Sequence, residues 1–358
     1  MSFLNKNTLF VPLVIAALTT ISFATLAAAE EPAEPGAAGK TGFITITAED
    51  GAVSKPWHTL SGLTADPNDP TRLFAVADHD SPPARIFELD VSNGAAKIVR
   101  EILLKNASSG NECDEVGIEG VDLEKLDLEG VAAKGKGGFW VASEGNRKKE
   151  LLNQLLEVNV EGCVLQVVDL PVDITKRLVK KGFEGVALDE TENATIVYSA
   201  LQVPLEEDDD KNVKSDTEYR TRIGAYDVGK KDWTFFLYPL LATGNQTGVS
   251  ELLHLGDGRF AAIERDSAAG QLAKVKLVTT FDLKDLEGAG VGEEAPTATN
   301  KRTAIDLIGL YAKHGRAVDE QIEGLAVTAD GNVYAVVDNN EVKGTPLLRL
   351  GKASDLFP

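Results

Sequence analysis

The sequence has few of the side chains that bind zinc or act as general bases, with only four histidines and two cysteines among 358 residues. The histidines are scattered, no two of them have the spacing of a zinc-binding motif, and none lies beside an obvious serine nucleophile. Also missing are the Gly-x-Ser-x-Gly elbow, the phosphate-binding Walker loop and the dinucleotide-binding fingerprint. The sequence therefore offers no support for a zinc site or a serine-hydrolase triad.

Positive charge is scarce as well. The chain has 36 lysines and arginines against 56 aspartates and glutamates, so its net charge is −20. A surface of this charge repels nucleic acids and anionic membranes, and neither is expected as a partner. The same surface suits divalent cations, although solubility alone also explains an acidic exported protein.

One long uncharged run is present, at residues 7–29, directly after Lys6. Its apolar centre and the small residues Ala27-Ala28-Ala29 indicate a secretory signal peptide over residues 1–29. An uncleaved membrane anchor is the alternative, because the run is long enough to span a bilayer. The run contains no lipoprotein cysteine. We therefore expect an exported protein, periplasmic or secreted, without stable membrane insertion.

Residues 30–40 are rich in Glu, Pro, Ala and Gly, a composition typical of a flexible linker. Residues 41–358 are expected to form one domain, since closed β-architectures are often this long. Cys113 and Cys163 are the only cysteines, and in an exported chain they most simply form one disulfide. Closing a loop of this size stabilises a protein by about 4 kcal/mol in the chain-entropy model.

Closely similar acidic turns recur along the chain. Two further copies, at Ser61 and Ser250, have serine in place of glutamate. From Ser61 through the three glutamates and Ser250, the spacings are 68, 55, 66 and 73 residues, which is the period of a large propeller blade. The three acidic copies are Leu128-Glu129-Gly130-Val131-Ala132, Phe183-Glu184-Gly185-Val186-Ala187 and Ile322-Glu323-Gly324-Leu325-Ala326.

A second strand follows these turns after a turn signal such as Asp257-Gly258 or Asp330-Gly331. These hairpins and the β-branched strands after them predict an all-β protein, with helical patterns mainly at residues 174–180 and 305–314. Five hairpins plus the strand-rich residues 222–241 indicate a six-bladed β-propeller. Residues 41–47 could close the ring by pairing beside the last blade. A β-sandwich is the alternative, but it is not expected to repeat a Glu-Gly pair at blade length.

In an antiparallel hairpin the start of the first strand lies beside the end of the second. Acidic residues at these positions should therefore project from the same end of each blade. The first strand of a blade lines the central channel, so the glutamates of the three acidic turns are expected nearest the axis. The predicted metal ligands are Glu129, Glu144, Glu184, Glu264, Glu323 and Asp338.

Carboxylates gathered in a small space raise one another's pKa unless a cation lies among them. Oxygen ligands with flexible spacing suit Ca²⁺ better than Zn²⁺, and such an ion could polarise a carbonyl or phosphoryl oxygen. In the alternative, the Glu-Gly pairs only bond backbone amides and hold the blades together. The catalytic interpretation assigns catalysis to Glu129, Glu184, Glu323 and Arg265, and substrate binding to Arg147 and Arg222.

Several motifs, in their order along the chain, resemble the exported "esterase-like activity of phytase" family over nearly all of the mature chain. They include Gly138-Phe139-Trp140-Val141-Ala142-Ser143-Glu144-Gly145, Phe260-Ala261-Ala262-Ile263-Glu264-Arg265-Asp266 and the three acidic turns. The resemblance implies a β-propeller and a hydrolase of phosphoesters or other esters. More distantly, the arrangement is similar to six-bladed calcium-dependent lactonases and phosphotriesterases, which favour Asn at several positions where this chain has Glu.

The expected protein is thus an exported, phytase-like β-propeller that binds Ca²⁺ and hydrolyses a small anionic or ester substrate. One rival interpretation is a non-catalytic binding or scaffolding propeller whose acids serve structure. The other is a sugar lactonase.

Overall fold

The computed structural model describes residues 41–53, 57, 59–78, 83–145, 151, 153–178, 181–205, 219–243, 246–338 and 345–358. The predicted signal peptide, the predicted linker and Arg147 lie outside these residues. None of the helices in the described ranges has the length and apolar character needed to cross a membrane.

The described part of the chain is built from twenty strands, almost all of them antiparallel, in three four-stranded sheets and one eight-stranded sheet. The larger sheet consists of two four-stranded groups, so we number five groups as blades 1 to 5. Blade 1 contains β2 (Leu60–Ala65), β3 (Arg72–Ala77), β4 (Arg85–Asp90) and β5 (Ala96–Leu103). Blade 2 contains β6 (Leu128–Ala133), β7 (Phe139–Ser143), β8 (Gln154–Val158) and β9 (Val164–Asp169).

The other three blades follow in chain order. Blade 3 contains β10 (Phe183–Glu190), β11 (Thr195–Leu201), β12 (Arg220–Asp227) and β13 (Asp232–Pro239). Blade 4 contains β14 (Thr247–Gly256), β15 (Arg259–Asp266), β16 (Lys276–Asp282) and β17 (Thr299–Asp306). Blade 5 contains β18 (Gln321–Val327), β19 (Asn332–Asp338), β20 (Pro346–Lys352) and the N-terminal strand β1 (Gly42–Ala48).

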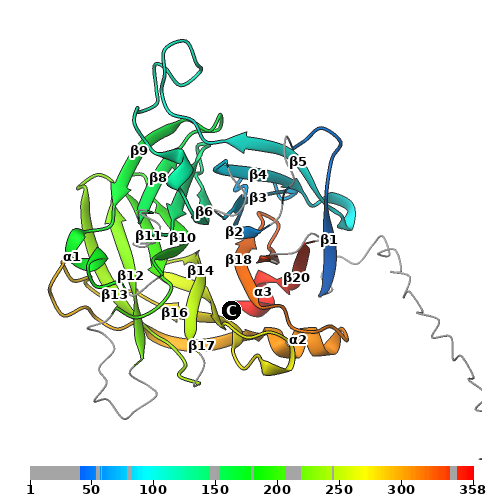
Figure 1. Cartoon of the computed structure of the whole chain (residues 1–358). Coiled ribbons are helices and arrows are strands. Elements are labelled where there is room, and N and C mark those ends of the chain that lie inside the picture. The colour runs from blue at the N-terminus through cyan, green and yellow to red at the C-terminus, as the bar shows by residue number, and fades with distance from the viewer. Residues whose placement is uncertain are drawn as a thin grey trace, which may run out of the picture. The chain divides into compact units, whose positions relative to one another are not determined.

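The first strand of each blade faces the centre of a ring. β2, β6, β10, β14 and β18 contact one another in that order, and β18 returns to β2 (Figure 1). Five hydrophobic clusters fill the spaces between successive blades, so each sheet is buried on both faces. Two-sided burial explains why strands such as Phe139–Ser143 are apolar at nearly every position rather than at alternate ones. The all-β propeller expectation is confirmed.

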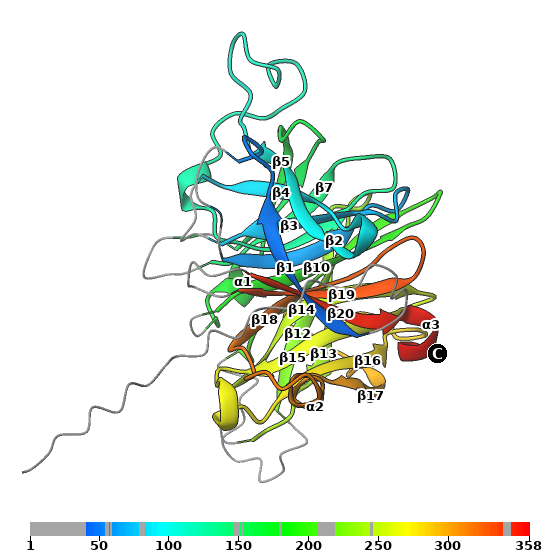
Figure 2. The same ribbon diagram turned by 90° about the vertical axis from the view of Figure 1, so that its right-hand side faces the viewer.

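The expectation of six blades is not confirmed, because the described residues make five four-stranded groups. The prediction of a sixth blade depends on the strand-rich residues 222–241. These residues lie mostly in β12 and β13, the two outer strands of blade 3. The expected closure by residues 41–47 is confirmed, since β1 pairs antiparallel with β20. The end of β1 also pairs parallel with β5, which joins blade 5 to blade 1 (Figure 2).

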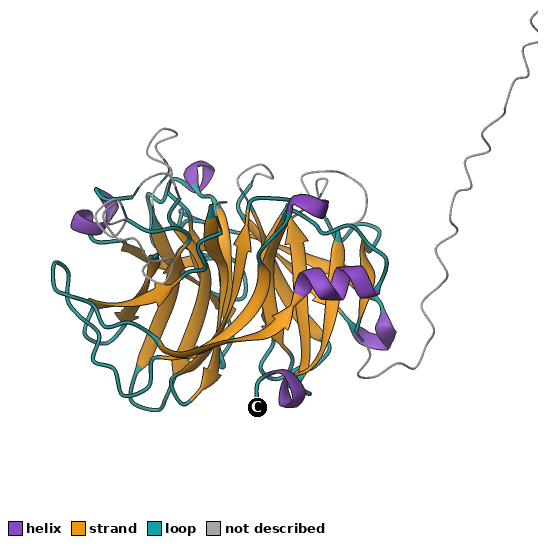
Figure 3. Ribbon diagram, turned by 90° about the horizontal axis from the view of Figure 1, so that it is seen from below, coloured by secondary structure: helices purple, strands orange, loops and turns teal. Residues whose placement is uncertain are grey.

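Helices are short and lie at the edges of the strands (Figure 3). The helix expected at residues 305–314 is present as α2 (Leu307–Lys313). The one expected at residues 174–180 is not, since α1 (Val172–Thr175) overlaps only its first two residues, and residues 179 and 180 lie outside the described part of the chain. A third helix, α3 (Ala353–Leu356), ends the chain, and 3₁₀ turns occur at Ser92–Gly94, Leu123–Lys125 and Gly270–Leu272.

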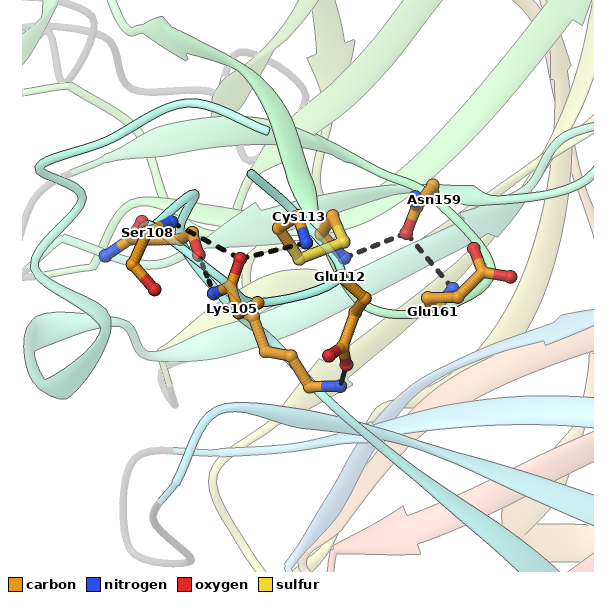
Figure 4. The surroundings of a disulfide bond; sticks show 9 residues. Lys105, Ser108, Glu112, Cys113, Asn159 and Glu161 are labelled. Atoms are coloured by element: carbon orange, nitrogen blue, oxygen red, sulfur yellow. Dashed lines mark hydrogen bonds and ion pairs between the residues drawn. A yellow bond between two sulfur atoms is a disulfide. The ribbon is translucent and has the colours of Figure 1, made fainter. Parts of the chain in front are cut away.

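The predicted disulfide between Cys113 and Cys163 is present. It joins the long connection between β5 and β6 to the turn between β8 and β9, and both cysteines are fully buried. Asn159 accepts hydrogen bonds from the backbone of Glu161 and Cys163 and so holds the turn in shape (Figure 4). A disulfide of this kind indicates an oxidising environment.

Candidate functional site

Each of the five inner strands carries a β-bulge at the repeated position. The register shifts around Ser61, Glu129, Glu184, Ser250 and Glu323, the five residues that define the sequence repeat. A bulge places two residues opposite one and re-aims the side chain between them. The repeat seen in the sequence is therefore a repeated kink in the strands that surround the centre.

A glycine follows four of these residues, all except Ser250, and allows the inner strands to approach closely. A Cβ on Gly62 would lie 2.6 Å from the carbonyl oxygen of Glu129, and one on Gly324 would lie 2.5 Å from the Cβ of Leu63. Real Cβ atoms do not approach backbone or side-chain carbon so closely. The Glu-Gly pair thus combines an inward acid with the only residue that leaves room for the neighbouring strand.

Ser61 of blade 1 links acids from blades 2 and 5. Its hydroxyl donates to Glu129 Oε2 at 2.6 Å and lies 3.4 Å from Glu323 Oε2. The other oxygen of Glu323 accepts a hydrogen bond from the Arg265 guanidinium. All three of the acidic and hydroxyl side chains are buried, with Ser61 fully inaccessible. The structure therefore brings Glu129 and Glu323 together, as the repeat predicted.

Glu144 reaches the same place from the end of the second strand of blade 2. One of its oxygens lies 3.2 Å from Lys181 Nζ, and the other accepts a hydrogen bond from the backbone N–H of Gly182 at 3.1 Å. One ligand oxygen each from Asp127, Glu129 and Glu144 lies within 4.8 Å of the others, a geometry that could hold a metal ion. We call Asp127, Glu129, Glu144, Glu184 and Glu323 the acidic centre.

Glu184 differs from the other members of the acidic centre. It is 1% exposed, and neither of its carboxylate oxygens has a hydrogen-bond partner among the described residues. A buried ionised carboxylate without a partner costs several kcal/mol, so such groups are normally protonated, paired or bound to a cation. Glu184 is therefore the strongest indication that the centre accepts a positive ligand.

The pKa values of three glutamates in the centre are raised. Burial raises the pKa of Glu129, and the charges of Glu184, Glu323 and Glu144 raise it further. Burial likewise raises the pKa of Glu184, with added repulsion from Glu144 and Glu323. Burial raises the pKa of Glu144 to about 7, although Lys181 acts in the opposite direction. The four glutamates of the centre thus share the two cations, Lys181 and Arg265, that the described residues bring to them.

A different acid closes the ring in blade 4, where the repeat reads Ser250-Glu251 instead of Glu-Gly. Glu251 is 1% exposed and accepts backbone N–H groups from three inner strands, at Leu63 (3.0 Å), Leu252 (2.9 Å) and Leu325 (3.3 Å). Burial raises its pKa, while these amides and that of Val186 act to lower it. Glu251 is a structural hub, and its contacts favour the amide-binding interpretation for this one glutamate.

The remaining predicted site residues lie in other places. Asp338 ends β19 opposite Gln321, at the same end of blade 5 as Glu323. Glu264 is fully buried between outer strands, where Tyr238 Oη (2.9 Å), Lys301 Nζ (2.5 Å) and the backbone N–H of Leu241 (2.5 Å) surround it. The predicted metal-binding role of Glu264 therefore stays a prediction.

Arg222 lies in β12, the third strand of blade 3, opposite Leu237. Arg265 of blade 4 pairs with Glu323 of blade 5, across the interface between these blades. The β-bulge of β18 lies at Glu323.

A cavity of about 260 Å³ adjoins the acidic centre. Lys181 and Arg265 belong both to its wall and to the set of side chains that contact the acids. Gln202 and Gln246 from blades 3 and 4, and Gln321 from blade 5, supply amide groups to the same wall. Glu320 also lines the wall, so the cavity combines charges of both signs with uncharged donors and acceptors next to a cluster of carboxylates.

Three residues of this site were not predicted from the sequence. Asp127 directly precedes the first acidic turn, and its position two residues before Glu129 was the available signal, since side chains two apart on a strand share a face. Glu251 is not predicted because Ser250 occupies the repeat position. The available signal is that Glu251 stands where the other copies of the repeat have glycine. Nothing in the sequence pointed to Lys181.

Solved structures with a similar fold have low sequence identity. A putative oxidoreductase (glucose dehydrogenase) from Thermus thermophilus is 11% identical, with 83% of this chain and 85% of that chain covered and a TM-score of 0.36. The Malassezia sympodialis allergen Mala s 1 is 13% identical, with 81% and 77% covered and a TM-score of 0.38. The C-terminal WD40 domain of Sif2 is 10% identical, with 88% and 99% covered and a TM-score of 0.33.

No curated protein matches the chain. The phytase-like family model, described as "esterase-like activity of phytase", matches residues 55–341. These residues include all five inner strands and the whole acidic centre. The chain belongs to the phytase-like family.

Proposed function

We propose that this protein is an exported, Ca²⁺-dependent hydrolase of phosphate esters or related esters, with its reaction site at the acidic centre. The observation that carries this proposal is Glu184, a buried carboxylate with no hydrogen-bond partner among the described residues, surrounded by other carboxylates. Membership of the phytase-like family supports the choice of an ester substrate.

The residues of the centre fit a calcium ion. Asp127, Glu129 and Glu144 offer oxygen ligands within 4.8 Å of one another, and Ca²⁺ prefers oxygen ligands in flexible geometry. Glu184 is not one of these three residues, but its two oxygens lack protein hydrogen bonds in the described structure and its charge interacts with that of Glu144, so it adds to the attraction of the site for a cation. When bound, the ion would polarise a phosphoryl or carbonyl oxygen and activate water.

The chain's own residues supply orientation and charge. The Arg265 guanidinium and the Lys181 ammonium line the cavity, where they neutralise an anionic group of the substrate. The three glutamine side chains of the cavity wall orient uncharged parts of the substrate by hydrogen bonds. Ser61 holds Glu129 and Glu323 in place, because its hydroxyl lies between them. The predicted contribution of Arg147 to substrate binding is retained as part of this proposal.

The test measures hydrolysis of generic phosphate and carboxylic esters by the purified mature protein, with calcium and with chelator. We expect activity that chelation abolishes and that the double substitution Glu129→Gln with Glu323→Gln lowers by at least about 100-fold. Glu190→Gln, at the exposed outer end of β10, is the matched control and should retain activity. Activity insensitive to both chelator and the double substitution would refute the mechanism.

Two other outcomes would identify the rival functions. A melting temperature that depends on calcium, without turnover on a broad panel of esters, would establish a binding or scaffolding propeller. The hydrogen bonds that Glu251 and Glu144 accept from backbone amides are the kind of structural contact that this function requires. Opening of sugar lactones in preference to phosphate release would establish a lactonase. Export is tested separately, by N-terminal sequencing of the mature protein, which should begin near Glu30.

A further inference from the structure

Lys181 contacts Glu144, one of the carboxylates that would bind a metal ion in the acidic centre. We infer that the Lys181 ammonium is a tethered cation that holds Glu144 while the centre is metal-free, and that metal binding displaces it into the adjoining cavity. This inference rests on the proposed metal site. It makes Lys181 a competitor of the metal rather than a permanent partner of Glu144.

The contacts of Glu144 define the competition. Lys181 Nζ lies 3.2 Å from Glu144 Oε2, and the next residue in the chain, Gly182, donates its N–H to Oε1. One short segment therefore takes both oxygens of a carboxylate that also belongs to the metal-binding triad. A metal ion bound to Oε2 would replace the hydrogen bond from the Lys181 ammonium to that oxygen. The hydrogen bond from the Gly182 N–H to Oε1 can persist.

Charge explains why the ammonium lies there. Besides Asp127 the centre gathers four carboxylates, and the described residues bring Lys181 and Arg265 to these four, so negative charge is in excess among them. The charges of Glu144, Glu184 and Glu129 all attract Lys181. Glu184, buried without a partner in the described structure, shows that the two cations do not satisfy the centre. A divalent ion would satisfy it better and would then repel the ammonium.

Lys181 is free to move, whereas Arg265 is not. The Lys181 side chain is 47% exposed, but that of Arg265 is only 10% exposed. Lysine carries its charge on four flexible methylene groups, and the cavity lies directly beside this one. Displacement would therefore leave Arg265 on Glu323 and transfer a positive charge from the metal site to the cavity wall. In this way metal binding would prepare the cavity for an anion.

Calcium affinity tests the inference without any measurement of turnover. Isothermal titration of Ca²⁺ into the metal-free full-length mature protein should show about ten-fold tighter binding for Lys181→Met than for the wild type, because the competing charged hydrogen bond is lost. Lys181→Arg keeps the charge and should stay within about two-fold of the wild type. Lys230→Met, on the exposed Lys230–Asp227 pair, is the control and should not change the affinity. Equal or weaker binding by Lys181→Met would overturn the inference.

The wild-type protein provides an independent arm that does not depend on a variant's folding. A crystal structure with Ca²⁺ should show Lys181 Nζ outside hydrogen-bond distance of Glu144 Oε2 and directed into the cavity. An unchanged contact would overturn the inference. Calcium binding without ester hydrolysis would refute the proposed function and leave this inference intact, while absence of divalent-ion binding by the wild type would overturn both.

Discussion

Glu184 shows at the scale of a single residue how the fold and the site oppose each other. The fold buries this side chain almost completely, and the described residues supply it with no donor. Burial and neighbouring acids both raise its pKa, so the metal-free protein carries a cost at this position. A residue that lowers stability in this way is retained most simply because it binds a ligand.

Glu184→Gln should therefore stabilise the metal-free protein and weaken calcium binding. The amide keeps the shape and removes the buried charge, so we expect about 2 kcal/mol of added stability in chelator. Thermal melting with chelator and with calcium measures both effects, and Glu190→Gln on the same strand is the control. A lower melting temperature in chelator would show that the carboxylate is stabilising as it stands.

The stability of the metal-free protein should fall as pH rises. The pKa of Glu144 is about 7 in the folded protein against an ordinary value of 4.5, because the buried carboxyl resists ionisation. A group that binds its proton more tightly when folded stabilises the fold at low pH and loses that effect as pH rises through the interval between the two values. For Glu144 alone the loss is about 3 kcal/mol, and the raised pKa values of Glu129 and Glu184 extend it upward.

Melting curves from about pH 5 to pH 8 in chelator should thus show a falling transition temperature. Saturating calcium should reduce or reverse this slope, because the ion binds the ionised carboxylates. A metal-free transition temperature that is flat or rises over this range would contradict the expected ionisation of the centre.

The individual residues of the site were predicted less completely from the sequence than the fold was. Glu129, Glu184 and Glu323 could be assigned to a common centre because the repeat indicates an equivalent position in each blade. Lys181 could not, since it lies before β10 and reaches Glu144 only through the packing of blade 3 on blade 2. Contacts between blades have no local signature in the sequence.

At the scale of elements, the inner strands depend on Glu251 for their arrangement. Its two oxygens bond amides of β2, β14 and β18, which are brought together only at the centre of the ring. Glu251→Ala leaves these buried N–H groups without an acceptor, and we expect a loss of about 4 kcal/mol. Urea denaturation measures the loss, with Glu287→Ala on an exposed outer loop as the control. A change below about 1 kcal/mol would rule out the hub.

Hairpins were the best predicted elements, because a Gly-containing turn between two apolar strands specifies an antiparallel pair locally. Grouping of strands into blades was less reliable, as residues 222–241 show. Whether β12 begins a new sheet or continues the old one is decided by its hydrogen bonds to β11, not by its own composition. The register shift at each Glu-Gly pair was likewise invisible until the strands were paired.

At the scale of the whole molecule, the disulfide stabilises one long connection rather than the ring. Cys113 and Cys163 are separated by 50 residues, and the chain-entropy model gives about 4 kcal/mol for a loop of this length. Replacement of both cysteines by serine should lower the free energy of unfolding by up to that amount. Because the acidic centre lies on the inner strands, calcium affinity in native conditions should be retained, and its loss would show that the connection shapes the site.

Ring closure by β1 yields a second prediction at this scale. A chain that begins at residue 50 lacks β1 and exposes the edges of β20 and β5, which are open to pairing with other molecules. We expect lower thermal stability and concentration-dependent aggregation, measured by melting and by light scattering. A chain that begins at residue 41 keeps the strand and is the control. Equal behaviour of the two chains would show that closure contributes little.

The pairing of β1 with β20 also bears on the order in which the protein acquires its structure. β1 can pair with β5 early in synthesis, but its antiparallel partner β20 lies more than 300 residues later, so the bonds that close the ring form only after β20 has been made. Contacts so distant in sequence are slow to form. Until then the ring stays open. A latch made from two strands so far apart in the sequence would thus delay closure of the ring until nearly the whole chain is available.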